Sequence, residues 1–201
     1  SGKIGDAPVP LENQLVRGLA EGIGALHRAR IIHGDMSDQN VLVMLEGGRY
    51  IAKYSDMGNS HLCEDPKQRM KIKRGHIDFE DKAMCALSLK TGSQFVTLTG
   101  CEAFAKDMYG VGRLILQVMT RKSLFSSMPY SCETPSIGAQ IVECAQYISS
   151  GKATVDLRAC GIFGGVVDAL LKDKPSERLT AGGLSETVTK INNHLANMTH
   201  R

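Results

Sequence analysis

The first part of the chain has its hydrophobic residues at helical spacing. Leucine and isoleucine recur every three or four positions, with polar residues between them. This spacing is typical of an amphipathic helix. The residues that share it are Leu11, Leu15, Leu19, Ile23 and Leu26. We therefore expect a helix over residues 11–29, with Pro10 in its first turn, where proline is favoured.

Two short apolar runs after this helix predict a β-hairpin. Residues 41–45 are apolar throughout, which is typical of a buried strand. Residues 50–54 predict a second strand, and residues 46–49, which include two glycines, supply the turn. An extended segment is expected just before the hairpin, at residues 30–33.

The second half of the chain contains a further apolar run at residues 114–119. The predicted fold class is mainly α with a small β-hairpin. A chain of 201 residues is long enough to bury a substantial core, and we expect one domain spanning residues 1–201.

Composition and charge narrow the classes of function. The hydrophobic share of 42% and the charged share of 22% are those of an ordinary globular protein. The formal net charge of +3 is small, and the basic residues do not alternate with aromatic ones, so no nucleic-acid partner is expected. No apolar run reaches the length of a membrane span.

The six cysteines indicate reduced thiols. None of them has the C-x-x-C spacing of a zinc site or a redox pair, and buried thiols are the simpler expectation. The sequence has no secretory signal pattern. The default localisation is therefore cytoplasmic or nuclear, although Ser1 in place of an initiator methionine is compatible with an earlier removal of a targeting segment.

Three oxygen-bearing side chains flank the predicted hairpin. Asp35 and Asn40 precede its first strand, and Asp56 follows its second strand, sixteen residues after Asn40. Antiparallel pairing brings Asn40 and Asp56 close together. An amide and a carboxylate oxygen are hard ligands that suit Mg²⁺.

This pattern resembles the catalytic and metal-binding loops of protein kinases. The motifs that carry the resemblance are His33-Gly34-Asp35, then Asn40, then Asp56-Met57-Gly58. The resemblance implies that Asp35 is the catalytic base, and that Asn40 and Asp56 bind the Mg²⁺ that accompanies ATP. It implies structural roles for His33, which would contact Met57, and for Gly58, which would adopt torsions closed to other residues.

Two later motifs extend the resemblance to a kinase-like C-terminal lobe. Asp107 opens a D-x-x-G-x-G stretch similar to the start of the central kinase helix, where the aspartate holds the backbone of the catalytic loop. Arg178 lies in a stretch similar to the D-P-x-x-R-P-T-A motif near the kinase C-terminus. The resemblance implies that the apolar run at residues 114–119 belongs to the buried central helix and that a last helix covers residues 184–196. The N-terminal lobe is not represented, because only 34 residues precede Asp35 and they contain no glycine-rich loop followed by V-A-I-K.

The chain also departs from the kinase pattern. Gly34 stands where many kinases have an arginine, so activation by loop phosphorylation is not expected. Ser37 replaces a lysine that contacts the transferred phosphate. No A-P-E motif lies between Asp56 and Asp107, and Glu102 is too close to Asp107 to be the partner of Arg178. We expect this intervening segment to be remodelled.

A basic run lies within the remodelled segment. Residues 67–74 carry five positive charges in eight positions. The simpler interpretation is a solvated loop. The alternative is a docking patch for an acidic partner, because opposite charges raise the rate of encounter.

Three functional hypotheses follow. The chain is half of an ATP-dependent serine/threonine-type kinase, inactive alone, or it is a pseudokinase or scaffold whose open face docks on a partner protein. A small-molecule phosphotransferase of the aminoglycoside kinase type also uses an H-G-D start, but it fits the Asp107 and Arg178 motifs poorly. In the first two cases the face left by the missing lobe is apolar and needs a protein partner.

Overall fold

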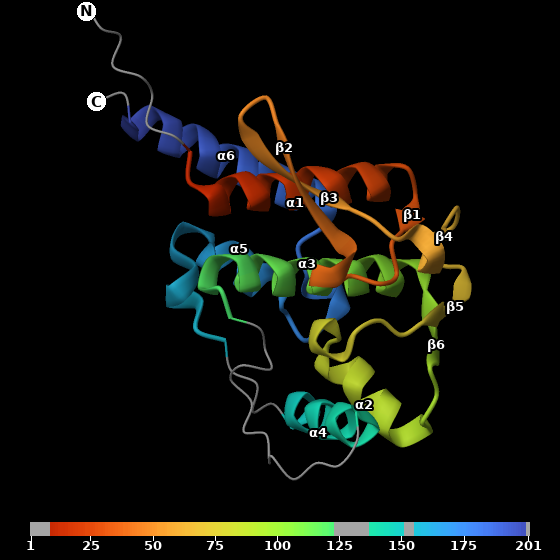
Figure 1. Ribbon diagram of the computed structural model, residues 1–201. Helices are drawn as coiled ribbons and strands as arrows, with labels where there is room; N and C mark the ends of the chain where they lie inside the picture. The colour runs from red at the N-terminus through yellow and green to blue at the C-terminus, as the bar shows by residue number, and fades with distance from the viewer. Residues whose placement is uncertain (1–8, 123–136, 151–154, 200–201) are drawn as a thin grey trace, which may run out of the picture.

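The fold is built around one long central helix (Figure 1). The computed structural model describes residues 9–122, 137–150 and 155–199. Helix α3, Gly100–Thr120, runs through the middle, and α1, Leu11–Arg28, and α5, Gly164–Leu170, pack against it. Helix α6, Ala181–Thr199, lies against α1. The main hydrophobic core lies between these helices.

The predicted first helix is confirmed. Helix α1 begins at Leu11 and ends at Arg28, with Pro10 as its N-cap residue. Leu19 and Ile23 are buried as the spacing predicts, together with Val16 and Ala20. Leu15 and Leu26 are only partly buried, and Leu11 is exposed. The core stripe therefore comes directly from the helical period of the sequence.

The predicted hairpin is also present, but its first strand is not buried. Strand β2, Val41–Glu46, pairs antiparallel with β3, Arg49–Tyr54. One side of the hairpin packs on α1, where a Cβ on Gly18 would lie 2.7 Å from the backbone nitrogen of Ala52. The other side has no covering layer in the described part of the chain, and residues 42–46 are exposed. A continuous apolar run does not distinguish a strand covered on one face from one covered on both.

The segment between the hairpin and α3 forms structure that the sequence did not predict. Strand β5, Arg69–Lys73, pairs antiparallel with β6, Phe95–Thr99. Between them lies α2, Lys82–Thr91, which packs against α4, Ile137–Ser149. The basic run that we interpreted as a loop is therefore largely a strand.

The remaining elements are short. Strand β1, Ile31–Ile32, is the extended segment expected before the hairpin, and it pairs with β4, His61–Leu62. The 3-10 turns are η1 Asp38–Asn40, η2 Met57–Asn59, η3 Ile77–Phe79, η5 Leu157–Phe163 and η6 Pro175–Glu177.

Helix α3 begins seven residues earlier than its kinase-like motif implies. Thr99 is its N-cap, and the Thr99 hydroxyl accepts from the backbone N–H of Glu102 while the Glu102 carboxylate accepts from the N–H of Thr99. This capping box satisfies two donors at the helix start. Glu102 thus caps α3 and does not pair with Arg178. The last helix is also longer than expected, because α6 begins at Ala181.

The described residues form a mainly helical α+β fold with small two-stranded antiparallel sheets. No helix among them is long and apolar enough to cross a bilayer. Four of the cysteines are buried, as expected, and Cys101 is exposed. Cys132 lies outside the described residues.

Candidate functional site

Asp107 ties α3 to the loop that contains Asp35. Its carboxylate is buried and accepts hydrogen bonds from the backbone N–H groups of His33, at 2.8 Å, and Gly34, at 2.9 Å. The His27 ring nitrogen Nε2 lies 3.1 Å from the same carboxylate. The two backbone contacts are those that the kinase resemblance implies for this aspartate. His27 was not predicted as a partner of Asp107.

Gly34 is required by the path of the loop. Its φ of +81° lies in the left-handed region, which favours glycine. A Cβ at this position would also lie 2.5 Å from the backbone oxygen of Asn59. An arginine, which many kinases have at this place, does not fit without a shift of the backbone.

His33 is fully buried, and both of its ring nitrogens have hydrogen-bonding partners. Its Nδ1 accepts from the backbone N–H of Asp35 at 3.3 Å, and its Nε2 lies 3.0 Å from the carbonyl oxygen of Ser55. A ring that carries its proton on Nε2 satisfies both contacts. The hydrogen bond of Nε2 therefore goes to Ser55, whereas the residue expected to contact His33 was Met57.

Asp35 and Asn40 lie together. The Asn40 amide nitrogen donates to the backbone oxygen of Asp35 at 2.8 Å. The Asp35 carboxylate accepts from the side-chain amide of Asn59 at 3.0 Å through Oδ2. Its Oδ1 is buried without a hydrogen-bond partner among the described residues, and a Cβ on Gly75 would lie 3.0 Å from it. The carboxylate thus lies beneath the segment that follows β5.

Asp56 lies at the opposite foot of the hairpin from Asn40. The backbone N–H of Ser55 donates to the carbonyl oxygen of Asn40 at 2.9 Å, which places Asp56 one residue from Asn40 across the sheet. Asp56 is exposed and has a φ of 56°. Its Oδ1 accepts from the N–H of Gly58 at 3.1 Å.

The prediction for Gly58 was wrong. Gly58 does not have a positive φ; the left-handed torsion belongs to Asp56 itself. A Cβ on Gly58 would lie 3.1 Å from Asp56 Oδ1, so this glycine allows close approach to the carboxylate.

The Asn40 and Asp56 side chains fit a magnesium ion chemically. Neither the Asn40 Oδ1 nor the Asp56 Oδ2 accepts a hydrogen bond from any described residue. Mg²⁺ prefers such oxygen ligands and commonly completes its shell with water and phosphate oxygens. No cluster of three or more His, Cys, Asp or Glu side chains that could hold a metal occurs in the described ranges, and the pair here consists of one amide and one carboxylate.

A buried ion pair lies behind the loop. Lys106 Nζ lies 3.0 Å from Glu80 Oε1 and donates to the backbone oxygen of Gly34 at 3.1 Å. The N–H of Gly75 donates to the same Glu80 oxygen at 2.8 Å. Burial by itself lowers the pKa of Lys106, but the carboxylates of Glu80 and Asp107 outweigh it and hold this pKa above its ordinary value. Lys106 and Glu80 thus connect three segments at the site.

Arg178 also has a buried acidic partner, which the sequence analysis missed. Its guanidinium donates to the Asp81 carboxylate at 2.7 Å, and both side chains are almost fully buried. Three backbone carbonyls, of Ala105, Lys172 and Asp173, accept its other hydrogen bonds. The sequence did not indicate Asp81, because it is not part of an A-P-E motif. It lies 97 residues before Arg178 in the sequence, and only the fold brings the two side chains together.

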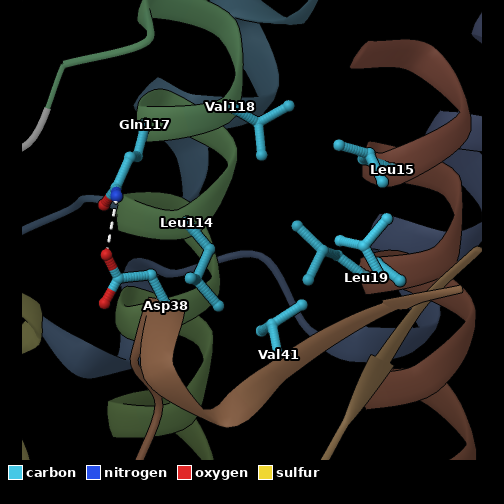
Figure 2. Close-up of a pocket in the computed structure, with 9 residues that line it drawn as sticks. Leu15, Leu19, Asp38, Val41, Leu114, Gln117 and Val118 are labelled. Carbon is cyan, nitrogen blue, oxygen red and sulfur yellow. Dashed lines mark hydrogen bonds between the residues drawn. The ribbon is translucent and has the colours of Figure 1, made fainter. Parts of the chain in front are cut away.

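An apolar pocket of about 180 Å³ lies beside the hairpin. Figure 2 shows Leu15 and Leu19 of α1 facing Leu114 and Val118 of α3 across it. At one side, Gln117 donates to the Asp38 carboxylate at 2.8 Å. The pocket therefore presents apolar surface with a single polar edge.

The arrangement supplies a carboxylate at Asp35 and two oxygens without hydrogen bonds at Asn40 and Asp56, in the segments that precede and follow the hairpin. Such a set can orient a hydroxyl and bind a cation bound to phosphate. No protein-family model matches this chain.

Proposed function

We propose that this chain is a divergent kinase-like C-terminal lobe that forms the catalytic and magnesium-binding half of an ATP-dependent serine/threonine-type phosphotransferase. The observation that carries the proposal is the pair of backbone hydrogen bonds from His33 and Gly34 to buried Asp107. These bonds fix the loop that holds Asp35. In a protein kinase the same contact orients the catalytic loop.

The residues have separate roles in this proposal. Asp35 accepts the proton of the substrate hydroxyl, and Asn40 and Asp56 hold Mg²⁺. The ion neutralises charge on the phosphates of ATP. The residues that grip the nucleotide in a kinase, on a glycine-rich loop and an N-lobe strand, are not found in this sequence. We therefore expect no phosphotransfer and negligible ATP affinity from these 201 residues alone.

A second function, that of a pseudokinase scaffold, is supported by the surroundings of Asp35. One carboxylate oxygen is bound by Asn59, and the other is buried close to Gly75. Ser37, at the place of the phosphate-contacting lysine, is fully buried. A substrate hydroxyl reaches this carboxylate only if the segment at Gly75 moves.

Both functions call for a protein partner on the hairpin. Leu42 and Met44 lie on the side of β2 opposite to the one that packs on α1, and they are 54% and 43% exposed. Neighbouring apolar residues on one uncovered face usually mark an interaction surface. The partner that fits is a polypeptide that supplies the nucleotide-gripping half, or a protein that replaces it.

The test starts from the native protein. Its intact mass and its copurifying chains are determined, and transfer of the γ-phosphate from labelled ATP is measured on that assembly. If the assembly is a kinase, Asp35→Asn lowers the rate of phosphate transfer by about 100-fold or more. The matched control Asp38→Asn, at an exposed acid outside the proposed roles, retains it.

Each outcome decides between the two functions. Phosphotransfer that depends on Asp35 supports the kinase half. A stable assembly in which neither the native chain nor its variants transfer phosphate supports the scaffold. Submicromolar binding of ATP by the 201 residues alone, measured by calorimetry, contradicts the expected need for a second half.

A further inference from the structure

The alternation of side chains along β5 places the basic residues of this strand on one face. Arg69, Lys71 and Lys73 are exposed, whereas Ile72 is fully buried and Met70 is partly buried. In a strand, successive side chains point to opposite sides. The three cations therefore form a single outward row, which a solvated loop would not produce.

The facing strand adds no acidic residue to this row. The register places Thr99 opposite Arg69, Thr97 opposite Lys71 and Phe95 opposite Lys73. These residues share the outward side of the ribbon, because directly paired residues of an antiparallel sheet point the same way.

The inward side fixes the orientation of the ribbon. Val96 and Leu98 of β6 pack with Ile72 and Ile32 in a second hydrophobic cluster. A slip of the strand by one residue would bury the cations, so the pattern of the core holds the row outward.

The charges of the row are largely unneutralised. No ion pair to Arg69, Lys71 or Lys73 occurs within the described ranges. The nearby acid is Glu102, which caps α3 at the Arg69 end and whose pKa is lowered mainly by its bonds to Thr99 and in small part by Arg69. Lys71 and Lys73 have no such neighbour among the described contacts. Lys71 lies over the ring of Phe95, 4.6 Å from its centroid.

We propose that the outward face of the β5–β6 ribbon is a docking site for an extended acidic peptide segment of a partner protein. In a strand, side chains on one face recur about every 6.8 Å. An extended peptide with acidic residues at alternate positions has the same repeat, so its carboxylates meet Arg69, Lys71 and Lys73 in turn. Phe95 offers an apolar contact at the end of the row.

A peptide fits this face better than a single-stranded nucleic acid. Nucleic-acid platforms combine cations with several aromatic rings on which bases stack. The outward face has one aromatic residue, Phe95, and the Lys71 ammonium covers one side of its ring.

The test uses the full chain and a fluorescent peptide with glutamate at alternate positions and serine between them. Binding is measured by fluorescence anisotropy at low and at moderate salt. We expect binding that weakens as salt rises, because exposed charge pairs are screened. The variant Arg69→Glu/Lys71→Glu/Lys73→Glu should lose about tenfold or more in affinity.

A second triple variant controls for net charge. Lys82→Glu/Lys90→Glu/Lys122→Glu changes three exposed lysines outside β5 and β6 and, like the first variant, takes the formal charge from +3 to −3. It should keep most of the peptide affinity. Circular dichroism and thermal melting establish that both variants are folded.

Several results would overturn the proposal. One is equal loss of binding in both triple variants, which would mean a response to net charge alone. Others are no binding by the unmodified chain, and binding that survives reversal of the ribbon cations. Tighter binding to oligo(dT) or to anionic phospholipid vesicles than to the acidic peptide would assign the face to another class of partner.

Discussion

Among the described glycines, Gly34 alone combines a positive φ with a close contact at the position of a Cβ. It combines a φ of +81° with a backbone oxygen 2.5 Å from the position of a Cβ. The left-handed torsion costs an L-residue about 1–2 kcal/mol, and the clash adds to it. We expect Gly34→Ala to lower the free energy of unfolding by about 2–4 kcal/mol, measured by urea denaturation.

Gly47 provides the matched control. It also has a positive φ, of 57°, but nothing lies within 4 Å of a Cβ there. Gly47→Ala should lower the free energy of unfolding only by the cost of the left-handed torsion, about 1–2 kcal/mol. Equal losses in the two variants would show that the contact with Asn59 is unimportant.

Among the described cysteines, the fold makes one thiol much more accessible than the others. Burial raises the pKa of Cys144 to about 12, and it raises the pKa of Cys85 as well, so few of these thiols ionise near neutral pH. Cys101 is exposed. In a Cys132→Ser background, we expect one fast-reacting thiol with Ellman's reagent. Cys101→Ser should remove this phase and Cys144→Ser should not.

The Asp81–Arg178 pair connects the start of α2 with the segment before α6. Removing one member of a buried ion pair leaves an uncompensated charge and costs about 3–5 kcal/mol. Asp81→Asn is the informative substitution, because asparagine also caps helices and so preserves the bond to the Met84 N–H. We expect a loss of about 3 kcal/mol by thermal or urea unfolding.

The exposed pair between Lys174 and Glu177 controls for this result. Lys174→Ala should change the free energy of unfolding by less than about 0.5 kcal/mol, because exposed pairs contribute little. A similar small change for Asp81→Asn would mean that the buried pair does not hold the two segments together.

The Lys106–Glu80 pair should show its effect in alkaline unfolding. Because the folded-state pKa of Lys106 lies above the ordinary 10.5, the stability that it contributes is complete below that value. It is lost as pH rises through the folded-state pKa. We expect Lys106→Met to be less stable than the unmodified chain by about 3–5 kcal/mol at neutral pH.

The measurement is the difference between the two proteins in urea unfolding across pH. This difference should be constant at neutral and mildly alkaline pH and should shrink only above about 10.5. Titration of tyrosines and cysteines changes the stability of both proteins alike, so it cancels in this difference. A difference that already falls between neutral and mildly alkaline pH would contradict the raised pKa.

At the scale of the whole molecule, the uncovered side of the hairpin should bind hydrophobic dyes. Leu42→Ser/Met44→Ser removes exposed apolar surface on the side of β2 that faces away from α1, so we expect dye fluorescence to fall by about half or more. Stability should change by less than about 0.5 kcal/mol, because both side chains are exposed.

The control replaces exposed apolar residues on other surfaces. Leu62→Ser/Ile162→Ser changes two side chains that are 62% and 46% exposed. It should leave most of the dye signal. If this variant lowers the fluorescence as much as the hairpin variant does, the hairpin is not the main apolar surface.

The sequence by itself determined the elements that depend on local periodicity or on turn residues, namely α1 and the hairpin. The leucine and isoleucine period gives α1 and its buried side, and the two glycines at 47–48 give the hairpin turn and hence the closeness of Asn40 and Asp56. These features depend on local periodicity and torsion, which a single sequence contains.

Only the tertiary structure decided which faces are covered and which distant charges meet. It left β2 exposed, made the basic run a strand with an outward row, and paired Asp81 with Arg178 and Glu80 with Lys106. It also placed Gly75 against the Asp35 carboxylate. Burial and long-range pairing depend on how elements pack together, and spacing along one chain does not specify that packing.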